Sequence, residues 1–349
     1  MKCGPTLQPA NGLFFKKEVQ AVCCTFHAAQ AQAKQIEEFA RWTLTKITPV
    51  SRHSALYHFT STDSSRGTPY IRGRGRTIWH KTWRTTLRTD AVEGELPSVE
   101  KDFTPISTWM EWDHGECILL INPSEAAAVD LHTQQPGSDV WLSKPKKSLS
   151  VPSLVPDVTQ VDLWDHPKML EHKGVLLVLG GAGGIPLVAQ VLQHTDPATC
   201  FGSGDRPCVA PLRSPVHVVY VCERDDVLMA RELGRWCAAK DSNSAQLQRL
   251  VLAISAPQED RAAAFPQTEA EKGDGWMELE TLDNVRVLQG ATASELLTSE
   301  LLQAEMAPLH ALGCCRVVVS GPAGFNLTVA EMLESQCQVD PNAITILAA

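Results

Sequence analysis

Hydrophobic runs in the second half of the chain alternate with segments that have a helical period. Five of these runs have the length and the branched residues typical of strands buried on both faces. They are Val175–Leu179, Val216–Val221, Leu250–Ile254, Asn284–Leu288 and Arg316–Ser320. Helical patterns lie between or after them, at Leu187–Leu192, Asp225–Ala239, Ser294–Gln303 and Thr328–Ser335. Strands that alternate with helices predict an α/β domain with a doubly wound parallel sheet.

The first half of the chain has a period of two. Trp42–Ile47 and Ala55–Thr60 alternate between apolar and polar residues, and a Pro/Ser turn separates them. Strand-like runs recur at Cys117–Ile121 and within Gln135–Leu142. Short strands at this spacing predict an all-β domain, a small antiparallel barrel.

These patterns divide the chain into three parts. Residues 1–40 form an N-terminal extension whose apolar residues fall roughly on one helical face. Residues 41–160 form the barrel domain, and residues 161–349 form the α/β domain. The boundary is placed near residue 160 because the Pro-, Ser- and Lys-rich segment Lys144–Pro156 indicates a linker. The polar segment Gln258–Asp274 indicates a loop insertion.

Composition narrows the class of protein. The 349 residues are enough for two domains, and a hydrophobic content of 44% supports real cores. A net charge of −9 disfavours nucleic acid as a partner. No apolar run reaches the roughly 18 residues of a transmembrane helix. No metal-ligand spacing is present, so no metal site is predicted.

The eleven cysteines include no CxxC pair and follow no secretory signal, which indicates reduced thiols in an intracellular protein. The first seventeen residues carry three lysines, no acid and no arginine. Import into mitochondria and a cytoplasmic protein with a helix packed on its body both stay open. The oligomeric state is not indicated.

A basic stretch, Ser64–Thr89, contains seven Arg or Lys residues and no acid. It includes Trp79, Trp83 and the alternating run Arg72–Arg76. Three interpretations stay open: an RNA-contacting segment, a docking patch for an acidic protein, or a solvated strand pair with long basic side chains. The acidity of the whole chain weakens the first of them.

A glycine-rich turn follows the buried strand Val175–Leu179. Four glycines occur within five residues (Gly180, Gly181, Gly183 and Gly184), and Pro186 then opens a helical pattern. Glycine tolerates positive φ and lets a ligand approach the backbone, and proline suits the first turn of a helix. A helix N-terminus at such a turn offers N–H groups to phosphate. The turn is therefore a candidate dinucleotide site, although many similar turns only need a tight corner.

Four segments carry a more specific resemblance. In chain order they are Lys101–Ser107 (KDFTPIS), the glycine turn, Glu223–Leu233 (ERDDVLMAREL) and Val319–Phe325 (VSGPAGF). In the same order, they are similar to four segments of one superfamily. These are the flavin motif R-x-Y-T-x-x-S, the GGTGITP turn, the segment after the second strand of the pyridine-nucleotide domain, and the C-G-P-x-x-[MF] turn. The chain from about residue 41 onward thus resembles the ferredoxin–NADP reductase superfamily, in its NADH–cytochrome b5 reductase branch.

The resemblance implies an FAD-binding barrel. Phe103 would stack on the isoalloxazine, and Thr104 would bond its N5 edge as a catalytic residue. Lys101 stands in the place of the arginine that binds the flavin diphosphate. Pro105 and Ser107 complete the flavin-binding segment.

The resemblance also implies an NADH or NADPH site in the second domain. The pyrophosphate would lie on the glycine turn, at Gly180, Gly181, Gly183, Gly184 and Pro186. Ser320, Gly321 and Pro322 would face the nicotinamide, with Ser320 as a second catalytic residue. Glu223 and Arg224 would contact the adenosine ribose. The glutamate favours the free 2′-OH of NADH, whereas the arginine suits a 2′-phosphate.

Several positions depart from the pattern. Lys101 replaces an arginine, Phe103 replaces a tyrosine, and Ala128 stands where a phosphate-binding serine is expected. Ser320 replaces a cysteine, and Ile185 replaces a threonine of the glycine turn. Three of these departures, Lys101, Phe103 and Ala128, fall in the flavin site. Lysine keeps the charge of arginine but lacks its planar bidentate fork.

The leading hypothesis is an FAD-dependent NAD(P)H oxidoreductase. Hydride would pass from the nicotinamide to the flavin, and electrons would leave to a haem or iron–sulfur acceptor. A b5-type cytochrome is one such acceptor, and its acidic face would suit the basic stretch. The alternative is a non-catalytic binding or assembly protein of the same fold with weakened flavin binding, and a third reading is an RNA binder.

Overall fold

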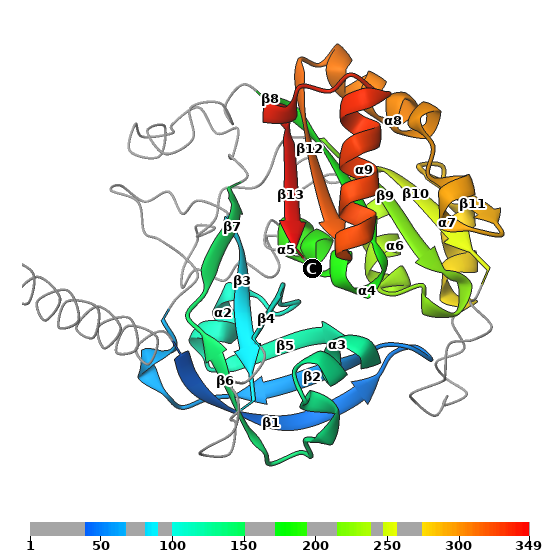
Figure 1. Cartoon of the computed structure of the whole chain (residues 1–349). Helices are drawn as coiled ribbons and strands as arrows, with labels where there is room; N and C mark the ends of the chain where they lie inside the picture. The colour runs from blue at the N-terminus through cyan, green and yellow to red at the C-terminus, as the bar shows by residue number, and fades with distance from the viewer. Residues whose placement is uncertain are drawn as a thin grey trace, which may run out of the picture.

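The structure, a computed structural model, describes residues 39–67, 81–89, 100–150, 172–193, 215–238, 247–256 and 274–348. Two sheets of different kinds organise these residues (Figure 1). The first sheet is antiparallel and lies in the N-terminal half, and the second is parallel with helices on both faces. The predicted order, an antiparallel β domain followed by a doubly wound α/β domain, is confirmed.

The antiparallel sheet has seven strands. They are β1 (Phe39–Pro49), β2 (Ala55–Thr60), β3 (Lys81–Arg88), β4 (Lys101–Phe103), β5 (Glu116–Ile121), β6 (Asp139–Ser143) and β7 (Lys146–Ser150). Six of them follow the order β4-β3-β6-β1-β2-β5, and β7 pairs with β3. The period-two pattern of β1 and β2 buries Trp42, Leu44, Tyr57 and Phe59 inside the sheet. Trp112 of α2 (Trp109–Asp113) packs on Trp42, with ring centroids 4.6 Å apart.

One sequence prediction is wrong in this domain. Lys144–Pro156 was expected as a linker, but Lys146–Ser150 is strand β7, with Thr82 of β3 opposite Leu149. A polar segment with a single leucine carries almost no strand signal of its own, so the partner strand decides its conformation. The sheet therefore extends to Ser150, and the boundary predicted near residue 160 lies outside the described residues, as do residues 1–38 and the run Arg72–Arg76.

The parallel sheet has six strands in the order β11-β10-β9-β8-β12-β13. They are β8 (His172–Gly180), β9 (Val216–Glu223), β10 (Leu247–Ser255), β11 (Val285–Gly290), β12 (Cys314–Gly321) and β13 (Ile344–Ala348). Five match the predicted runs, and β13 is an additional edge strand. The strand order reverses between β8 and β12, which is the topological switch point of the sheet.

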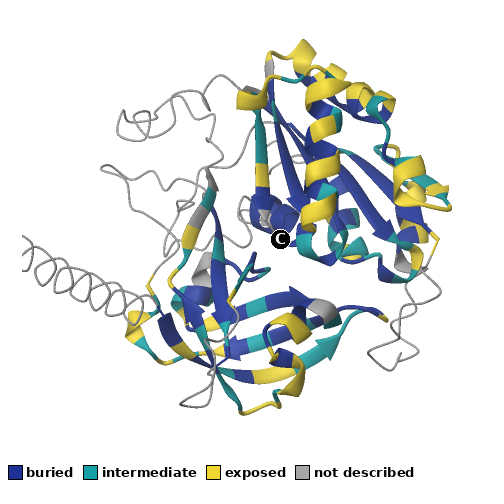
Figure 2. Cartoon of the chain, in the orientation of Figure 1, coloured by how far each residue is buried: buried dark blue, intermediate teal, exposed yellow. Residues whose placement is uncertain are grey.

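Helices cover both faces of this sheet. They are α4 (Gly181–Gly184), α5 (Pro186–Gln193), α6 (Ala230–Ala238), α7 (Ala293–Leu296), α8 (Ser299–Ala311) and α9 (Ala323–Ser335). Leucines of α5 and α6 pack with one face of the strands, and those of α8 and α9 pack with the other. Figure 2 shows the strands as a buried layer beneath helices whose outer faces are exposed.

Two predicted helices differ from the structure. Ser294–Gln303 is not one helix, because Thr298 accepts a hydrogen bond from the Leu301 N–H and starts α8 afresh after α7. Asp225–Ala239 begins as a 3-10 turn, η4 (Arg224–Asp226), and becomes α-helical only at Ala230. Among the described residues, no helix has the length and apolar character needed to cross a membrane.

Candidate nucleotide site

The glycine turn lies where β8 meets the switch point. Gly181 has a φ of 56°, a conformation that glycine adopts without strain. A Cβ on Gly184 would collide with the carbonyl oxygen of Ser320, so only glycine lets β12 approach this closely. A Cβ on Gly180 would lie 2.7 Å from the Phe325 ring. The turn is therefore fixed by its fit to β12 and to α9.

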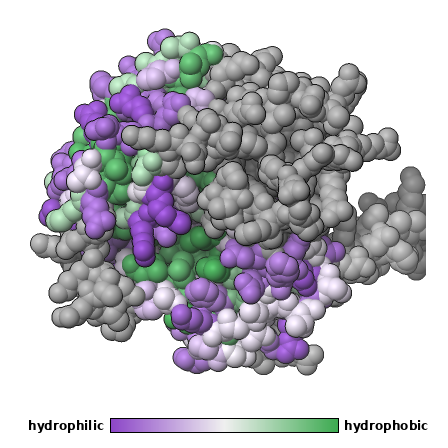
Figure 3. Space-filling model, turned by 180° about the vertical axis from the view of Figure 1, so that it is seen from behind, coloured by the Kyte–Doolittle hydropathy of each residue, from purple (hydrophilic) through white to green (hydrophobic). Residues whose placement is uncertain are grey.

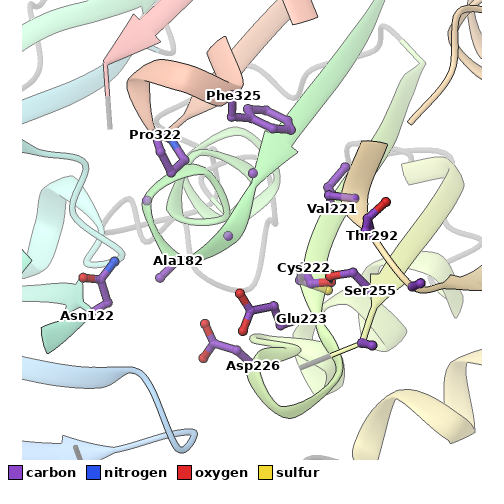
Figure 4. A pocket seen from close by; sticks show the side chains of 16 residues that line it. Asn122, Ala182, Val221, Cys222, Glu223, Asp226, Ser255, Thr292, Pro322 and Phe325 are labelled. Carbon is purple, nitrogen blue, oxygen red and sulfur yellow. The ribbon is translucent and has the colours of Figure 1, made fainter. Parts of the chain in front are cut away.

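A cavity of about 340 Å³ opens at this turn (Figure 4). Its walls come from the carboxyl ends of β8, β9 and β10, from the start of α9 and from Asn122 of the barrel domain. Figure 4 shows Glu223 and Asp226 together, with Asn122 across from them and Phe325 at the opposite end. A crevice at this edge of a doubly wound sheet is where such folds bind nucleotides.

The cavity has one acidic end. Glu223 is the last residue of β9, and Asp226 follows on η4. The Asp226 carboxylate accepts hydrogen bonds from Ser51 and, at 3.3 Å, from Ser54, both in the turn between β1 and β2. Burial raises the pKa of the Cys222 thiol well above its usual value, and Asp226 raises it further, so this wall carries a neutral thiol.

Arg224 turns away from the cavity. Its Nη2 donates to the Gln289 side chain at 3.2 Å, and its guanidinium lies 5.9 Å from the centre of the Trp276 ring. Of the two residues predicted at the ribose, Glu223 is therefore placed in the cavity wall and Arg224 is not.

Ser320, Gly321 and Pro322 meet the glycine turn from the β12 side. Ser320 is 1% exposed, and its hydroxyl has no hydrogen-bond partner among the described residues. The Gly321 carbonyl accepts from Asn326 at 2.8 Å, and Pro322 lines the cavity. The structure thus brings these three predicted residues next to the four glycines.

The predicted flavin segment lies on β4 and the loop after it. Phe103 is 5% exposed and belongs to the aromatic core of the barrel domain, and Thr104 is buried as well. The Lys101 ammonium lies 5.5 Å from the centre of the Phe103 ring and forms an ion pair with Glu125, Nζ to Oε1, at 3.0 Å.

Two more residues of this segment have structural partners. The Ser107 hydroxyl accepts from the Ile118 N–H at 3.2 Å, which ties the loop to β5. The Pro105 carbonyl accepts from the Gln190 side chain at 3.0 Å, which ties the loop to α5 of the other domain. These contacts fix the segment between the domains.

The place predicted for the flavin diphosphate carries a carboxylate. Ala128 is the exposed last residue of α3 (Pro123–Ala128), whose first turn is closed by a capping box between Asn122 and Glu125. Because Glu125 caps its own helix and also pairs with Lys101, a phosphate beside Lys101 would meet this carboxylate. The residues present fit a pyridine nucleotide at the glycine turn, but they do not fit the diphosphate of FAD.

Three further ligand atoms converge beside the cavity. His53, Glu223 and Asp225 place them within 4.8 Å of one another, a set that could hold a divalent cation. In the structure, His53 Nε2 lies 3.1 Å from an Asp225 oxygen, so the two side chains bond to each other across the domain interface. No motif indicates this set, because His53 is 170 residues from Glu223 in the chain.

Three arginines in the described part of the basic stretch have partners elsewhere in the barrel domain. Arg84 pairs with Asp102 at 3.2 Å, and Arg88 pairs with Glu100 at 3.7 Å. Arg66 donates to the backbone carbonyls of Trp112 and Asp113. These contacts favour the interpretation of a strand with long basic side chains over a free basic docking patch.

Apolar side chains do not mark a docking face on the described surface either. The exposed large ones, Met277, Leu312, Leu327 and Ile346, lie on or beside four different elements. Seen from behind, hydrophilic residues cover much of the described surface, and hydrophobic residues gather near its centre (Figure 3). The four exposed large apolar side chains are scattered singly, which is normal for a protein surface.

No protein-family profile and no curated protein matches the chain. Three solved structures with a similar architecture share little sequence with this chain. The CS-b5R domains of human Ncb5or in the NAD+ form have a TM-score of 0.47 and 14% identity, covering 88% of this chain and 69% of that one. The cytochrome b5 reductase domain of Ulva prolifera nitrate reductase has a TM-score of 0.48 and 12% identity, covering 90% and 98%. Flavohemoglobin from Malassezia yamatoensis with bound FAD and heme has a TM-score of 0.48 and 16% identity, covering 89% and 60%.

Proposed function

We propose that the chain is an NADH-dependent oxidoreductase with the architecture of the ferredoxin–NADP reductase superfamily. The observation that carries this proposal is the cavity of about 340 Å³ at the switch point, which the glycine turn and Glu223 line together. The turn supplies backbone N–H groups for the diphosphate, since the first N–H groups of a helix lack helical partners. The open space beside Gly181 admits a ligand against the backbone.

The acidic end of the cavity favours NADH over NADPH. A carboxylate at the end of the second strand, here Glu223, can accept hydrogen bonds from ribose hydroxyls, and it repels a 2′-phosphate. Asp226 adds a second negative charge to the same wall, and Arg224 is directed toward Gln289. A 2′-phosphate would therefore meet two acids and no cation among the residues that line this wall.

Ser320 and Pro322 are the proposed nicotinamide contacts. The Ser320 hydroxyl is buried without a partner among the described residues, and Pro322, two residues on, lines the cavity. In the superfamily that the four segments resemble, a bound flavin accepts the hydride; in this chain Thr104 and Phe103 would be the residues beside such a ring system. A haem or iron–sulfur protein, such as a b5-type cytochrome, would then take single electrons.

A second candidate function is a binding or assembly protein that keeps the nucleotide site and lacks efficient flavin binding. The Lys101–Glu125 pair favours it, because the cation expected for the flavin diphosphate is already neutralised. An absorbance spectrum of the purified protein separates the two candidates. A yellow protein that bleaches anaerobically with NADH is expected of the oxidoreductase, and a colourless one that FAD cannot reconstitute of the second candidate.

Changing Gly183 to valine tests the nucleotide site. Gly183 lines the cavity, so a β-branched side chain there would fill the space of the diphosphate. We expect Gly183→Val to weaken NADH binding about tenfold or more, because a blocked phosphate site loses several hydrogen bonds of about 1.5 kcal/mol or more each. The measurement is titration calorimetry with NADH.

Gly324→Ala is the matched control, because nothing lies within 4 Å of a Cβ at that position. It should leave the dissociation constant for NADH unchanged. Unaltered NADH binding by a folded Gly183→Val protein would show that the diphosphate lies elsewhere.

A further inference from the structure

Glu125 is held at two points on the barrel side of the cavity. Its Oε1 bonds the Lys101 ammonium at 3.0 Å, and its Oε2 accepts from the Asn122 N–H at 3.2 Å. The Asn122 side chain in turn accepts from the Glu125 N–H at 2.9 Å. The Glu125 side chain is 10% exposed, so this carboxylate is part of the packed structure.

The ion pair between Lys101 and Glu125 also involves strand β4. Lys101 lies at the start of β4, above the ring of Phe103, and its side chain is 26% exposed. Asn122, the other partner of Glu125, lines the nucleotide cavity. The carboxylate therefore stands between the segment predicted to hold a flavin and the cavity proposed to hold NADH.

We propose that Glu125 closes this position to a diphosphate, so that the barrel discriminates against FAD and in favour of a flavin without phosphate. This inference rests on the barrel being the flavin-binding half of the proposed function, and it is independent of how NADH binds. A diphosphate placed beside Lys101 would have to displace Glu125 from its ion pair. Alternatively it would lie against a carboxylate, and like charges a few ångströms apart in a partly buried site repel strongly.

The consequence is a specific order of affinities. Riboflavin shares the ring system of FAD and carries no phosphate, so Glu125 does not repel its tail. The wild-type protein should bind riboflavin more tightly than FAD, the reverse of what a lysine free to pair with phosphate would give.

The variant Glu125→Gln tests this directly. Glutamine also completes a capping box, so α3 keeps its first turn while the negative charge is removed. We expect the dissociation constant for FAD to fall about tenfold or more, and that for riboflavin to change less than twofold. Binding is read from the quenching of flavin fluorescence during titration, with NADH titrated in parallel.

Two further variants keep the result interpretable. Glu116→Gln removes an exposed carboxylate from β5 and should leave all three affinities unchanged. Lys101→Met combined with Glu125→Gln should return FAD to its wild-type affinity, because the gain depends on the lysine that Glu125 releases.

Three results would overturn the proposal. One is a wild-type protein purified with one FAD per chain. Another is a folded Glu125→Gln protein whose FAD affinity equals that of the wild type. The third is the absence of riboflavin binding in all variants, and intact NADH binding in the same samples would then leave the proposed nucleotide site standing.

Discussion

Glu223 and Arg224 show how neighbours in the sequence separate in the structure. Glu223 ends β9 and lines the cavity, whereas Arg224 starts a 3-10 turn that carries its side chain to Gln289. Sequence position alone left the choice of coenzyme open between an acid and a base. In the structure, only Glu223 lies in the cavity wall, so the acid and not the base faces a bound ligand.

Replacing Glu223 by glutamine should relax the preference for NADH. The amide removes the charge that opposes a 2′-phosphate and keeps a hydrogen-bond acceptor for the ribose. We expect the ratio of the NADPH and NADH dissociation constants to fall about tenfold, which corresponds to about 1.4 kcal/mol. Calorimetric titration of both coenzymes measures it.

Glu280→Gln is the matched control, because it removes one negative charge, as Glu223→Gln does, from an exposed position. Glu280→Gln should leave the ratio unchanged. An unaltered ratio in Glu223→Gln would mean that the adenosine end of the coenzyme does not reach this wall.

Some site residues follow from motifs, and others do not. The glycines, Ser320 and Phe103 lie in short patterns whose spacing fixes their place on a strand end or a turn. Glu125 and Gln190 lie outside these motifs, and the partners that give them their roles here are distant in the chain: Lys101 is 24 residues from Glu125, and Pro105 is 85 residues from Gln190. Contacts of this kind depend on how elements pack, and the local sequence does not encode that.

At the scale of elements, the buried strands were the most predictable part of the fold. Runs such as Val216–Val221 became strands because their residues have no exposed face and need none, whereas the edge strand β11 is only partly buried. β7 was missed because a sheet partner, and not its own composition, makes it a strand. The break between α7 and α8 was missed because Thr298 caps a new helix inside a continuous helical pattern.

Helix α8 carries a buried carboxylate, and we expect the stability of the fold to depend on the arginine that pairs with it. Glu305 is 1% exposed, and its carboxylate lies 3.3 Å from Arg249 Nη2 on β10 and 3.6 Å from the His217 ring on β9. Removing Arg249 would leave a buried carboxylate with weaker compensation. We expect Arg249→Met to lower the free energy of unfolding by about 2 kcal/mol in urea titrations near neutral pH.

The double variant Arg249→Met, Glu305→Gln distinguishes charge from packing. If the cost comes from the stranded carboxylate, the second change should recover most of the lost stability. If the double variant is as unstable as the single one, the stem of Arg249 and not its charge supports α8.

At the scale of the whole molecule, two buried polar clusters join the domains. Asp225 and Asp226 bond His53, Ser51 and Ser54 in the turn between β1 and β2. Gln190 of α5 forms the second cluster with the barrel domain. The sequence predicted two domains in the right order, but it offered no sign that they share a polar interface. Such an interface holds Asn122 of one domain over the cavity of the other.

The Gln190 cluster should be the more costly of the two to disrupt, because Gln190 is fully buried and both ends of its amide form hydrogen bonds. Its oxygen accepts from the Trp83 N–H at 2.8 Å, and its nitrogen donates to the carbonyls of Trp83 at 2.9 Å and Pro105 at 3.0 Å. Gln190→Leu keeps most of the volume and leaves three buried backbone groups without these partners. Such groups cost about 1–3 kcal/mol each when they stay unsatisfied. We expect the free energy of unfolding to fall by about 3 kcal/mol.

The loss should also change how the molecule unfolds. With this junction gone, each sheet still has a core, and the apolar contact of Leu120 with the α/β core remains between them. We expect the barrel domain and the α/β domain to melt in two separate calorimetric transitions where the wild type should show one. NADH affinity should be retained, because Gln190 does not line the cavity. Gln303→Leu, which loses one exposed hydrogen bond to the Gln336 carbonyl, should shift the melting temperature little and leave a single transition. A single, unshifted transition in Gln190→Leu would mean that the remaining contacts, the Asp226 cluster and the apolar packing of Leu120, are enough to couple the domains.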